Sequence, residues 1–152
     1  MDFYRTKDLK HVRTILVCPR IYSQMGDDYA PEPEDFTPNQ HPDIWYLVAG
    51  RSALIGLFCL VPQNRVCWEV HVALLPFSKT KERWEAARGL APWLAQNTPC
   101  KRLVASVPSN NWPAIVYGTH GMGMRYVGRH ERAFMKEGQL QDLVILGRSI
   151  GG

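Results

Sequence analysis

Along residues 66–75, a wholly apolar set of positions alternates with a mixed set, with the period of two that is typical of a β-strand. The apolar set is expected to face the core and comprises Val66, Trp68, Val70, Val72 and Leu74. The opposite set includes Glu69 and His71, which lie two residues apart and therefore on the same side of the strand. Pro76 ends the strand because it has no backbone N–H to donate to a neighbouring strand.

A polar loop and a helical pattern follow this strand. Apolar residues recur at helical spacing over residues 84–94, and Lys79, Lys81 and Arg83 cluster where that helix begins. A strand, a polar loop and a helix in succession form the arrangement with which α/β proteins bind anions at a helix N-terminus. Cations at the positive end of a helix dipole are unfavourable, so the cluster fits either a bound phosphate or a solvated basic turn.

The rest of the chain divides into further predicted elements. A helical stripe covers residues 7–17, a second short helix covers 21–25, and residues 26–43 form an irregular loop rich in proline and acidic residues. The remaining predicted elements are strands near 44–50, 53–61, 101–107, 124–134 and 140–146, and helices at about 80–96 and 110–120. This order predicts an α/β (α+β) fold in a single domain spanning residues 1–152, with a mixed sheet of about six or seven strands and helices on both faces.

Composition and charge exclude several classes of protein. The chain has 152 residues, 45% of them hydrophobic and 21% charged, as in an ordinary globular protein. A net charge of +4 is compatible with a phosphorylated ligand but too small to indicate nucleic-acid binding. No segment has the length of a membrane span and the N-terminus has no signal-peptide pattern, so we expect a cytoplasmic protein. Four scattered cysteines are expected to be free thiols: Cys18, Cys59, Cys67 and Cys100.

The C-terminal half resembles the GNAT N-acyltransferase superfamily. The family signature reads roughly Asn-x-x-Ala, then Tyr, then Gly-Phe-x-x-x-Gly, and NWPA (111–114), Tyr117 and GMRYVGR (123–129) match it, with Met124 in place of Phe. The resemblance covers about residues 44–147 and implies a mixed, mostly antiparallel central sheet of six or seven strands. The acidic loop and the strand end HVALLP (71–76) are most similar to small GNAT-like proteins encoded among head and tail genes of short-tailed phages.

The resemblance implies that the cofactor is acetyl-CoA or another acyl-CoA. Its pantetheine arm would lie beside the end of the 66–75 strand, and its pyrophosphate would lie on the loop and helix start that follow. The implied cofactor-binding residues are Leu74, Leu75, Lys79, Thr80, Lys81, Asn110 and Asn111. The family's loop normally reads Arg/Gln-x-x-Gly-x-Gly/Ala, whereas this sequence has Lys79-Thr80-Lys81-Glu82 and no glycine, which makes the pyrophosphate loop degenerate.

Three residues are the implied catalytic groups. Glu69 is placed to act as the base, His71 as a relay or an alternative base, and Tyr117 as the acid that protonates the leaving thiolate. A structural Glu–His pair at a sheet edge and an ordinary amphipathic-helix tyrosine are the alternatives. The acceptor would be an amine, and the acidic loop at 27–35 would favour a cationic one.

Two functions remain open from the sequence. The first is an N-acyltransferase that moves an acyl group from acyl-CoA to an amine. The second is a catalytically silent GNAT-fold protein that assembles with phage structural proteins and is associated with the virion.

Overall fold

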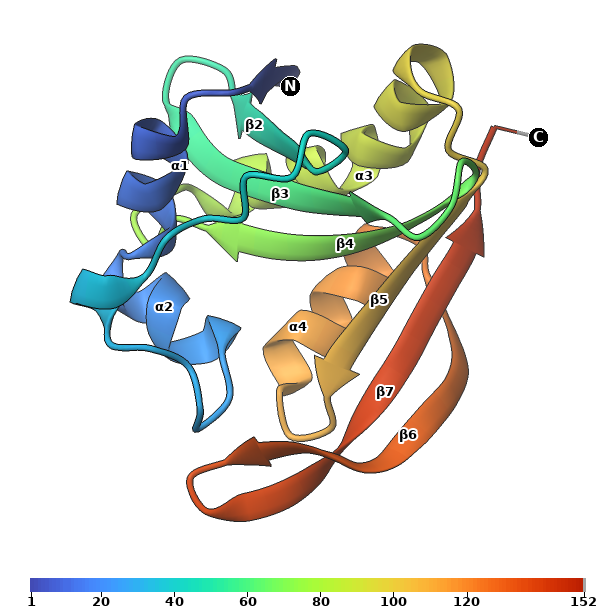
Figure 1. Ribbon diagram of the computed structural model, residues 1–152. Helices are drawn as coiled ribbons and strands as arrows, with labels where there is room; N and C mark the ends of the chain where they lie inside the picture. Colours follow the sequence, from blue (N-terminus) through green and yellow to red (C-terminus); the bar gives the residue numbers. More distant parts are fainter. Residues whose placement is uncertain (152) are drawn as a thin grey trace.

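The computed structural model describes residues 1–151 and contains a single seven-stranded sheet (Figure 1). Its strands are β1 (Asp2–Thr6), β2 (Trp45–Gly50), β3 (Leu54–Pro62), β4 (Cys67–Leu74), β5 (Arg102–Pro108), β6 (Arg125–Lys136) and β7 (Gln139–Ser149). They are ordered β1-β2-β3-β4-β5-β7-β6 in the sheet. Only the β4–β5 pair is parallel, so the sheet is mixed and mostly antiparallel, as predicted.

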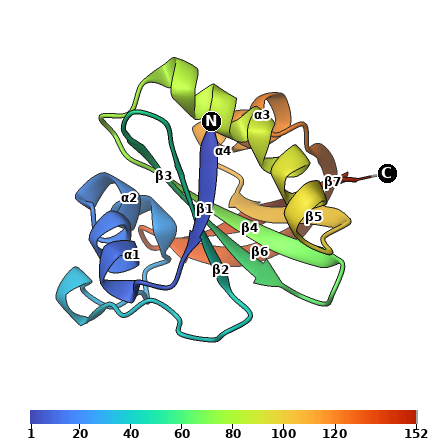
Figure 2. The ribbon, with the colours of Figure 1, turned by 90° about the horizontal axis from the view of Figure 1, so that it is seen from above.

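Helices cover both faces of this sheet, which confirms the predicted architecture (Figure 2). One face carries α1 (Leu9–Leu16) and α2 (Pro19–Met25), and the other carries α3 (Thr80–Asn97) and α4 (Trp112–Val116). Short turns of 3-10 helix at η1 (Pro33–Asp35) and of π-helix at η2 (Tyr117–Gly121) complete the set. The larger core cluster packs α3 against the sheet, and a smaller cluster packs α1 and α2 against the opposite face.

The strand β1 was not predicted. It pairs antiparallel with β2, from Asp2 opposite Gly50 to Thr6 opposite Tyr46, and forms one edge of the sheet. Asp2 and Tyr4 are exposed, and Phe3 packs against the larger core. Five residues with a single packed aromatic give too weak an alternation to recognise in the sequence, so this strand depends on its partner.

The strands β4 and β5 separate in the middle of the sheet. Their register contains only the pairs Cys67–Arg102, Trp68–Leu103 and Glu69–Val104, although both strands continue beyond these residues. Each strand stays paired with its other neighbour, so the divergence opens a gap inside a continuous sheet (Figure 1).

This gap corrects one prediction about β4. Trp68 and Val70 are buried, as expected for a core-facing set, but Val72 is 38% exposed. Val72 lies beyond the last pair with β5 and lines the cleft that opens there. Val66 is 44% exposed because it precedes the strand, so the prediction of a wholly buried apolar face is wrong at these positions.

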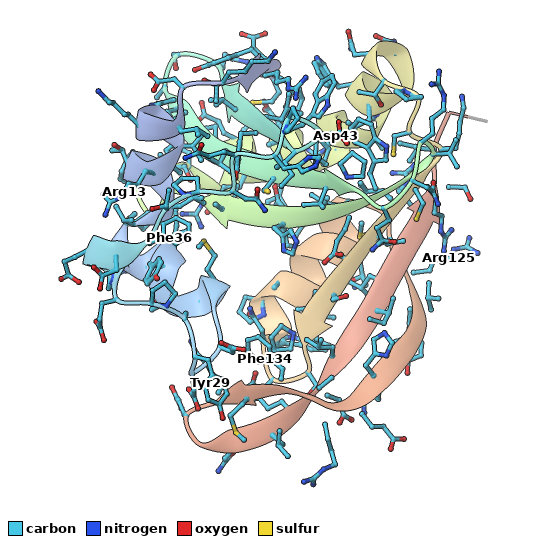
Figure 3. The ribbon with its side chains drawn as sticks, in the orientation of Figure 1. Arg13, Tyr29, Phe36, Asp43, Arg125 and Phe134 are labelled. Carbon is cyan, nitrogen blue, oxygen red and sulfur yellow. The ribbon has the colours of Figure 1, made fainter. Side chains whose placement is uncertain are left out.

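The hairpin of β6 and β7 is fastened to the loop that follows α2. Glu137 and Gly138 form its turn with φ values of 53° and 73°, and both backbone N–H groups donate to the Asp28 carboxylate at 2.8 Å. Lys136 Nζ donates to the carbonyl oxygens of Ser23 at 2.8 Å and Gly26 at 2.7 Å. Tyr29 and Phe134 are labelled where these two segments meet (Figure 3). These contacts join the last strands of the chain to its first helices.

Candidate active site

A cleft of about 470 Å³ occupies the gap between β4 and β5. Its lining comes from both faces of the sheet, so it passes through the sheet rather than lying on one side. The lining on the α2 side includes Arg20, Ile21, Gln24, Met25, His71 and Ala73. The lining on the α3 and α4 side includes Thr80, Arg83, Trp84, Asn111, Tyr117 and Met122.

Glu69 and His71 come together at this cleft, as their shared side of the strand predicts. The distance between His71 Nε2 and Glu69 Oε1 is 3.3 Å. The other carboxylate oxygen of Glu69 accepts a hydrogen bond from Gln63 Nε2 at 3.2 Å. His71 lines the cleft and its side chain is 54% exposed, whereas Glu69 lies behind it with a side chain that is 24% exposed. The imidazole can therefore meet a ligand, and the carboxylate lies directly behind it.

The helix α3 begins at the cleft with free backbone donors. Arg83 N is the first amide of this helix that finds a backbone acceptor, the carbonyl of Lys79 at 3.0 Å. The N–H groups of Thr80, Lys81 and Glu82 have no acceptor within residues 1–151, and Lys79 supplies no side-chain cap. Thr80 lines the cleft, whereas Lys79 and Lys81 are exposed and lie outside its lining. Free N–H groups at a helix start form an anion site, and the lysines add positive charge around it.

The loop before α3 is fixed by Arg83 rather than by glycine. Arg83 Nε donates to Ser78 Oγ at 2.7 Å, and Nη2 donates to the carbonyl oxygens of Leu75 at 2.8 Å and Pro76 at 3.0 Å. Leu74 lines the cleft, but Leu75 is buried and lies outside the lining. The guanidinium thus holds the loop in one conformation next to the free N–H groups of α3.

Tyr117 lines the cleft and joins η2 to α3. Its hydroxyl donates to the carbonyl oxygen of Arg83 at 2.8 Å, and its ring lies 5.6 Å from the Trp84 ring. Burial raises the pKa of Tyr117 above its usual value, so the hydroxyl keeps its proton at neutral pH. A Cβ built at Gly121 would lie 2.6 Å from Trp84 Cζ3, so this turn approaches α3 too closely for a side chain.

Asn111 is the N-cap residue of α4. Its side chain accepts from Ala114 N at 3.4 Å, which caps α4, and it lines the cleft. Asn110 is exposed and lies outside the lining. The predicted helix from 110 to 120 is therefore a short α-helix followed by a π-helical turn.

The sequence did not predict the residues that α2 itself contributes to the cleft. Arg20 and Gln24 reach it from a helix that is about fifty residues away from β4 in the chain, and no motif marks them. Ser106 on β5 also lines the cleft without any sequence signal.

Two further features bear on the class of site. Within residues 1–151, no group of three His, Cys, Asp or Glu side chains is arranged to hold a metal ion. In the same part of the chain, no helix is both long and apolar enough to cross a membrane.

No protein-family model matches the sequence, and no curated protein matches it either. Solved structures, in contrast, match it along nearly its whole length. A ribosomal-protein-alanine N-acetyltransferase from Brucella melitensis has a TM-score of 0.72 and 16% identity, over 99% of this chain and 100% of that chain. A spermidine N-acetyltransferase from Vibrio cholerae, solved with CoA and spermine, has a TM-score of 0.72 and 17% identity, over 98% and 95% of the two chains.

A GNAT superfamily phosphinothricin acetyltransferase from Sinorhizobium meliloti, solved with acetyl-CoA, has a TM-score of 0.68 and 15% identity, over 99% of this chain and 88% of that chain. At these identities the likeness establishes the architecture, which agrees with the sheet order and the separated strands described above. The protein has the GNAT fold, with a mixed and mostly antiparallel sheet that carries helices on both faces.

Proposed function

We propose that the protein is an N-acyltransferase that transfers an acyl group from acyl-CoA to an amine. The observation that carries this proposal is the separation of β4 from β5 beyond the Glu69–Val104 pair, which places a cleft beside the free start of α3. Structures with the same fold have been solved with CoA or acetyl-CoA, and their names include amine acceptors.

The residues present fit an acyl-CoA. Beyond Glu69 and Val104, the facing edges of β4 and β5 have no ladder partner across the gap, and backbone N–H and C=O groups require partners when covered. An extended pantetheine arm carries amide groups that can bond to such edges in the manner of a strand. The free N–H groups of Thr80, Lys81 and Glu82 would hold the pyrophosphate, with Lys79 and Lys81 adding charge. When bound, acyl-CoA supplies an activated acyl thioester.

The chain's own residues would manage the protons of the reaction. An ammonium acceptor must lose a proton before it can attack a carbonyl, and His71 reaches the cleft with the Glu69 carboxylate 3.3 Å behind it. His71 therefore takes the proton and Glu69 stabilises the resulting imidazolium. Tyr117 holds a proton at its Oη next to the cleft and can give it to the leaving thiolate if the bond to Arg83 O is released.

A catalytically silent protein of the same fold is the alternative. It is favoured by the absence of glycine from residues 79–84 and by the bond that holds the Tyr117 hydroxyl on the Arg83 carbonyl. A role among phage structural proteins, and a place in the virion, rest only on the sequence resemblance given above.

The test is an acyl-transfer assay of the full chain with acetyl-CoA and a panel of amines, read by mass spectrometry of the acylated product. Glu69→Gln and His71→Ala should each lower turnover, by roughly 10²–10⁴-fold for the group that acts as the base. His130→Ala is the matched control, because His130 is exposed on β6 and lies outside the cleft lining. Full activity in both Glu69→Gln and His71→Ala would remove this pair from the mechanism.

A further inference from the structure

The basic residues that line the cleft are Arg20, His71 and Arg83. No aspartate or glutamate of residues 1–151 belongs to the lining, and the nearby Glu69 carboxylate is engaged by His71 and Gln63. The α2 side, on which His71 lies, is the side from which an amine would approach the proposed base. The charged groups on the α2 side of the cleft should therefore influence which acceptor amines can bind.

Arg20 is the cation of this lining that is free to bind a ligand. The Arg83 guanidinium is occupied by Ser78 Oγ and by the carbonyl oxygens of Leu75 and Pro76. The Arg20 side chain is exposed, and it makes no hydrogen bond and no ion pair with any group in residues 1–151. Gln24 lies four residues further along α2 and also lines the cleft, so both side chains are on one face of the helix.

The acidic loop does not bring negative charge to the cleft. Both carboxylate oxygens of Asp28 accept N–H groups from the turn of the β6–β7 hairpin, and Asp27 Oδ1 accepts from Tyr29 N at 3.0 Å. These acids lie outside the cleft lining. The sequence-based expectation of a cationic acceptor depended on this loop flanking the site, and that support is absent.

The segment with Glu32, Glu34 and Asp35 is bonded to α1, away from the cleft lining. Arg13 of α1 donates to the carbonyl oxygens of Pro33 at 2.8 Å and Phe36 at 3.0 Å, and Figure 3 labels Arg13 and Phe36 beside each other on the α1 side of the molecule. The η1 turn is thereby anchored to α1, and its carboxylates also lie outside the cleft lining.

The helix α2, which carries Arg20, is held in place by hydrogen bonds. Lys136 Nζ donates to the carbonyl oxygens of Ser23 and Gly26 at the end of α2, and Tyr22 Oη donates to the carbonyl of Pro31. These bonds hold α2 against the β6–β7 hairpin and the loop that follows the helix. An arginine on a fixed helix can act as a position-specific anchor for a ligand.

We propose that the acceptor amine also carries a carboxylate, and that Arg20, with Gln24, binds it. A guanidinium presents paired N–H donors that match a carboxylate, and the amide of Gln24 can donate a further hydrogen bond. An amino-acid-like acceptor would then be anchored on α2 while its amine reaches His71. This inference rests on the proposed function, since it names the acceptor of the same site.

The experiment compares acceptors that differ only in charge, using the full chain and acetyl-CoA. The standard amino acids are set against their carboxamides, with spermidine as a cationic amine and phosphoethanolamine as an anionic amine without a carboxylate. The amino acids should be acetylated with the highest kcat/KM. Arg20→Ala should raise the KM for an amino acid roughly 10- to 100-fold. It should leave the KM for acetyl-CoA and the rate with a carboxamide unchanged. Arg20→Lys should recover part of the loss, and Arg88→Ala, an exposed arginine on α3 outside the cleft lining, should change nothing.

A second measurement separates failure of this inference from failure of the proposed function. Binding of the same amino acids and carboxamides is followed by NMR, without turnover, in wild type and Arg20→Ala. Transfer to amines with no preference for a carboxylate, or with preference for spermidine or phosphoethanolamine, overturns the inference and leaves the proposed function standing. Carboxylate-dependent binding that Arg20→Ala abolishes, without any transfer, supports the anchor and contradicts the proposed function. Neither transfer nor carboxylate-dependent binding contradicts both.

Discussion

Removing the Arg83 guanidinium should destabilise the protein through the loop before α3. Arg83→Met keeps most of the apolar stem of the side chain and deletes its hydrogen bonds to Ser78 Oγ and to the carbonyl oxygens of Leu75 and Pro76. The Leu75 carbonyl retains the N–H and hydroxyl of Ser78 at 3.1 and 2.6 Å. The Pro76 carbonyl retains no other partner within residues 1–151.

The magnitude follows from these contacts. A hydrogen bond from a charged donor contributes about 1.5–3 kcal/mol. Ser78 Oγ and the Leu75 carbonyl remain bonded to each other, and only the Pro76 carbonyl is left without a partner, so the loss in the free energy of unfolding should be about 2–4 kcal/mol. For a chain of this length, that corresponds to a fall in Tm of roughly 5–15 °C. Arg83→Lys should fall between wild type and Arg83→Met, because an ammonium group cannot reach all of these acceptors in the geometry of a guanidinium.

Thermal unfolding followed by circular dichroism is the assay, with Arg88→Met as the matched control. Arg88 lies on the same helix and is exposed, and its side chain makes no hydrogen bond or ion pair with the rest of residues 1–151. The control should melt within about 2 °C of wild type. Equal melting temperatures for Arg83→Met and Arg88→Met would refute the claim that Arg83 fixes this loop.

Three further predictions test other contacts. Gly121→Ala should lower the free energy of unfolding by about 1–3 kcal/mol, because a Cβ there would lie 2.6 Å from Trp84 Cζ3. Gly128→Ala, where a Cβ would have no atom within 4 Å, should leave the Tm unchanged in the same thermal unfolding experiment. Hydrogen bonds from the backbone of Gly138 and Glu137 hold the pKa of Asp28 below its usual value of 3.8. The stability that this adds is therefore present above pH 3.8 and is lost as the pH falls through the lowered pKa. Asp28→Asn should remove this acid dependence of the free energy of unfolding. An unchanged dependence of stability on pH in Asp28→Asn would contradict the contact. Burial raises the pKa of the Cys59 thiol to about 11 from 9.0, so its thiolate fraction at neutral pH is about 100-fold below that of an ordinary thiol. Cys59 and the buried Cys100 should resist iodoacetamide until the chain unfolds, and rapid native labelling seen by mass spectrometry would refute this.

Much of the fold could be predicted because its elements carry strong local patterns. The stripe of Val12, Ile15 and Leu16 marks α1, and the apolar run of 53–61 marks β3 as a central strand. The last two predicted strands, 124–134 and 140–146, pair as a hairpin whose turn contains Glu137 and Gly138 with positive φ values. The edge strand β1 could not be found in the same way, because its five residues are ordered by pairing with β2 rather than by their own periodicity.

The candidate site was only partly predictable. Strand geometry alone places Glu69 and His71 together, and the distance of 3.3 Å confirms that they meet. The sequence could not show that only His71 lines the cleft, because this depends on where β4 leaves β5. The place of Arg20 in the cleft could not be predicted either, because it depends on the packing of α2 against the β6–β7 hairpin near the other end of the chain.

The free thiols were predicted from spacing, and the structure records all four cysteines as unpaired within residues 1–151. The loop of residues 79–82 lacks the glycines that let the backbone approach a phosphate closely. In the structure its N–H groups are nevertheless free, because α3 begins at Thr80 without a side-chain cap and Arg83 fixes the preceding turn.

Binding of CoA tests the central claim most directly, since a cleft that holds no cofactor cannot transfer an acyl group. The measurement is the Tm of the full chain in a titration with CoA to millimolar concentration. Binding only to the native state adds about 2.7 kcal/mol at 100 times Kd, which is roughly 5–10 °C for a chain of this size. We expect a rise in Tm with CoA that the double variant Lys79→Ala and Lys81→Ala reduces and that Thr80→Gly with Glu82→Gly enlarges. An unchanged Tm for both wild type and the glycine variant would contradict the acyltransferase account.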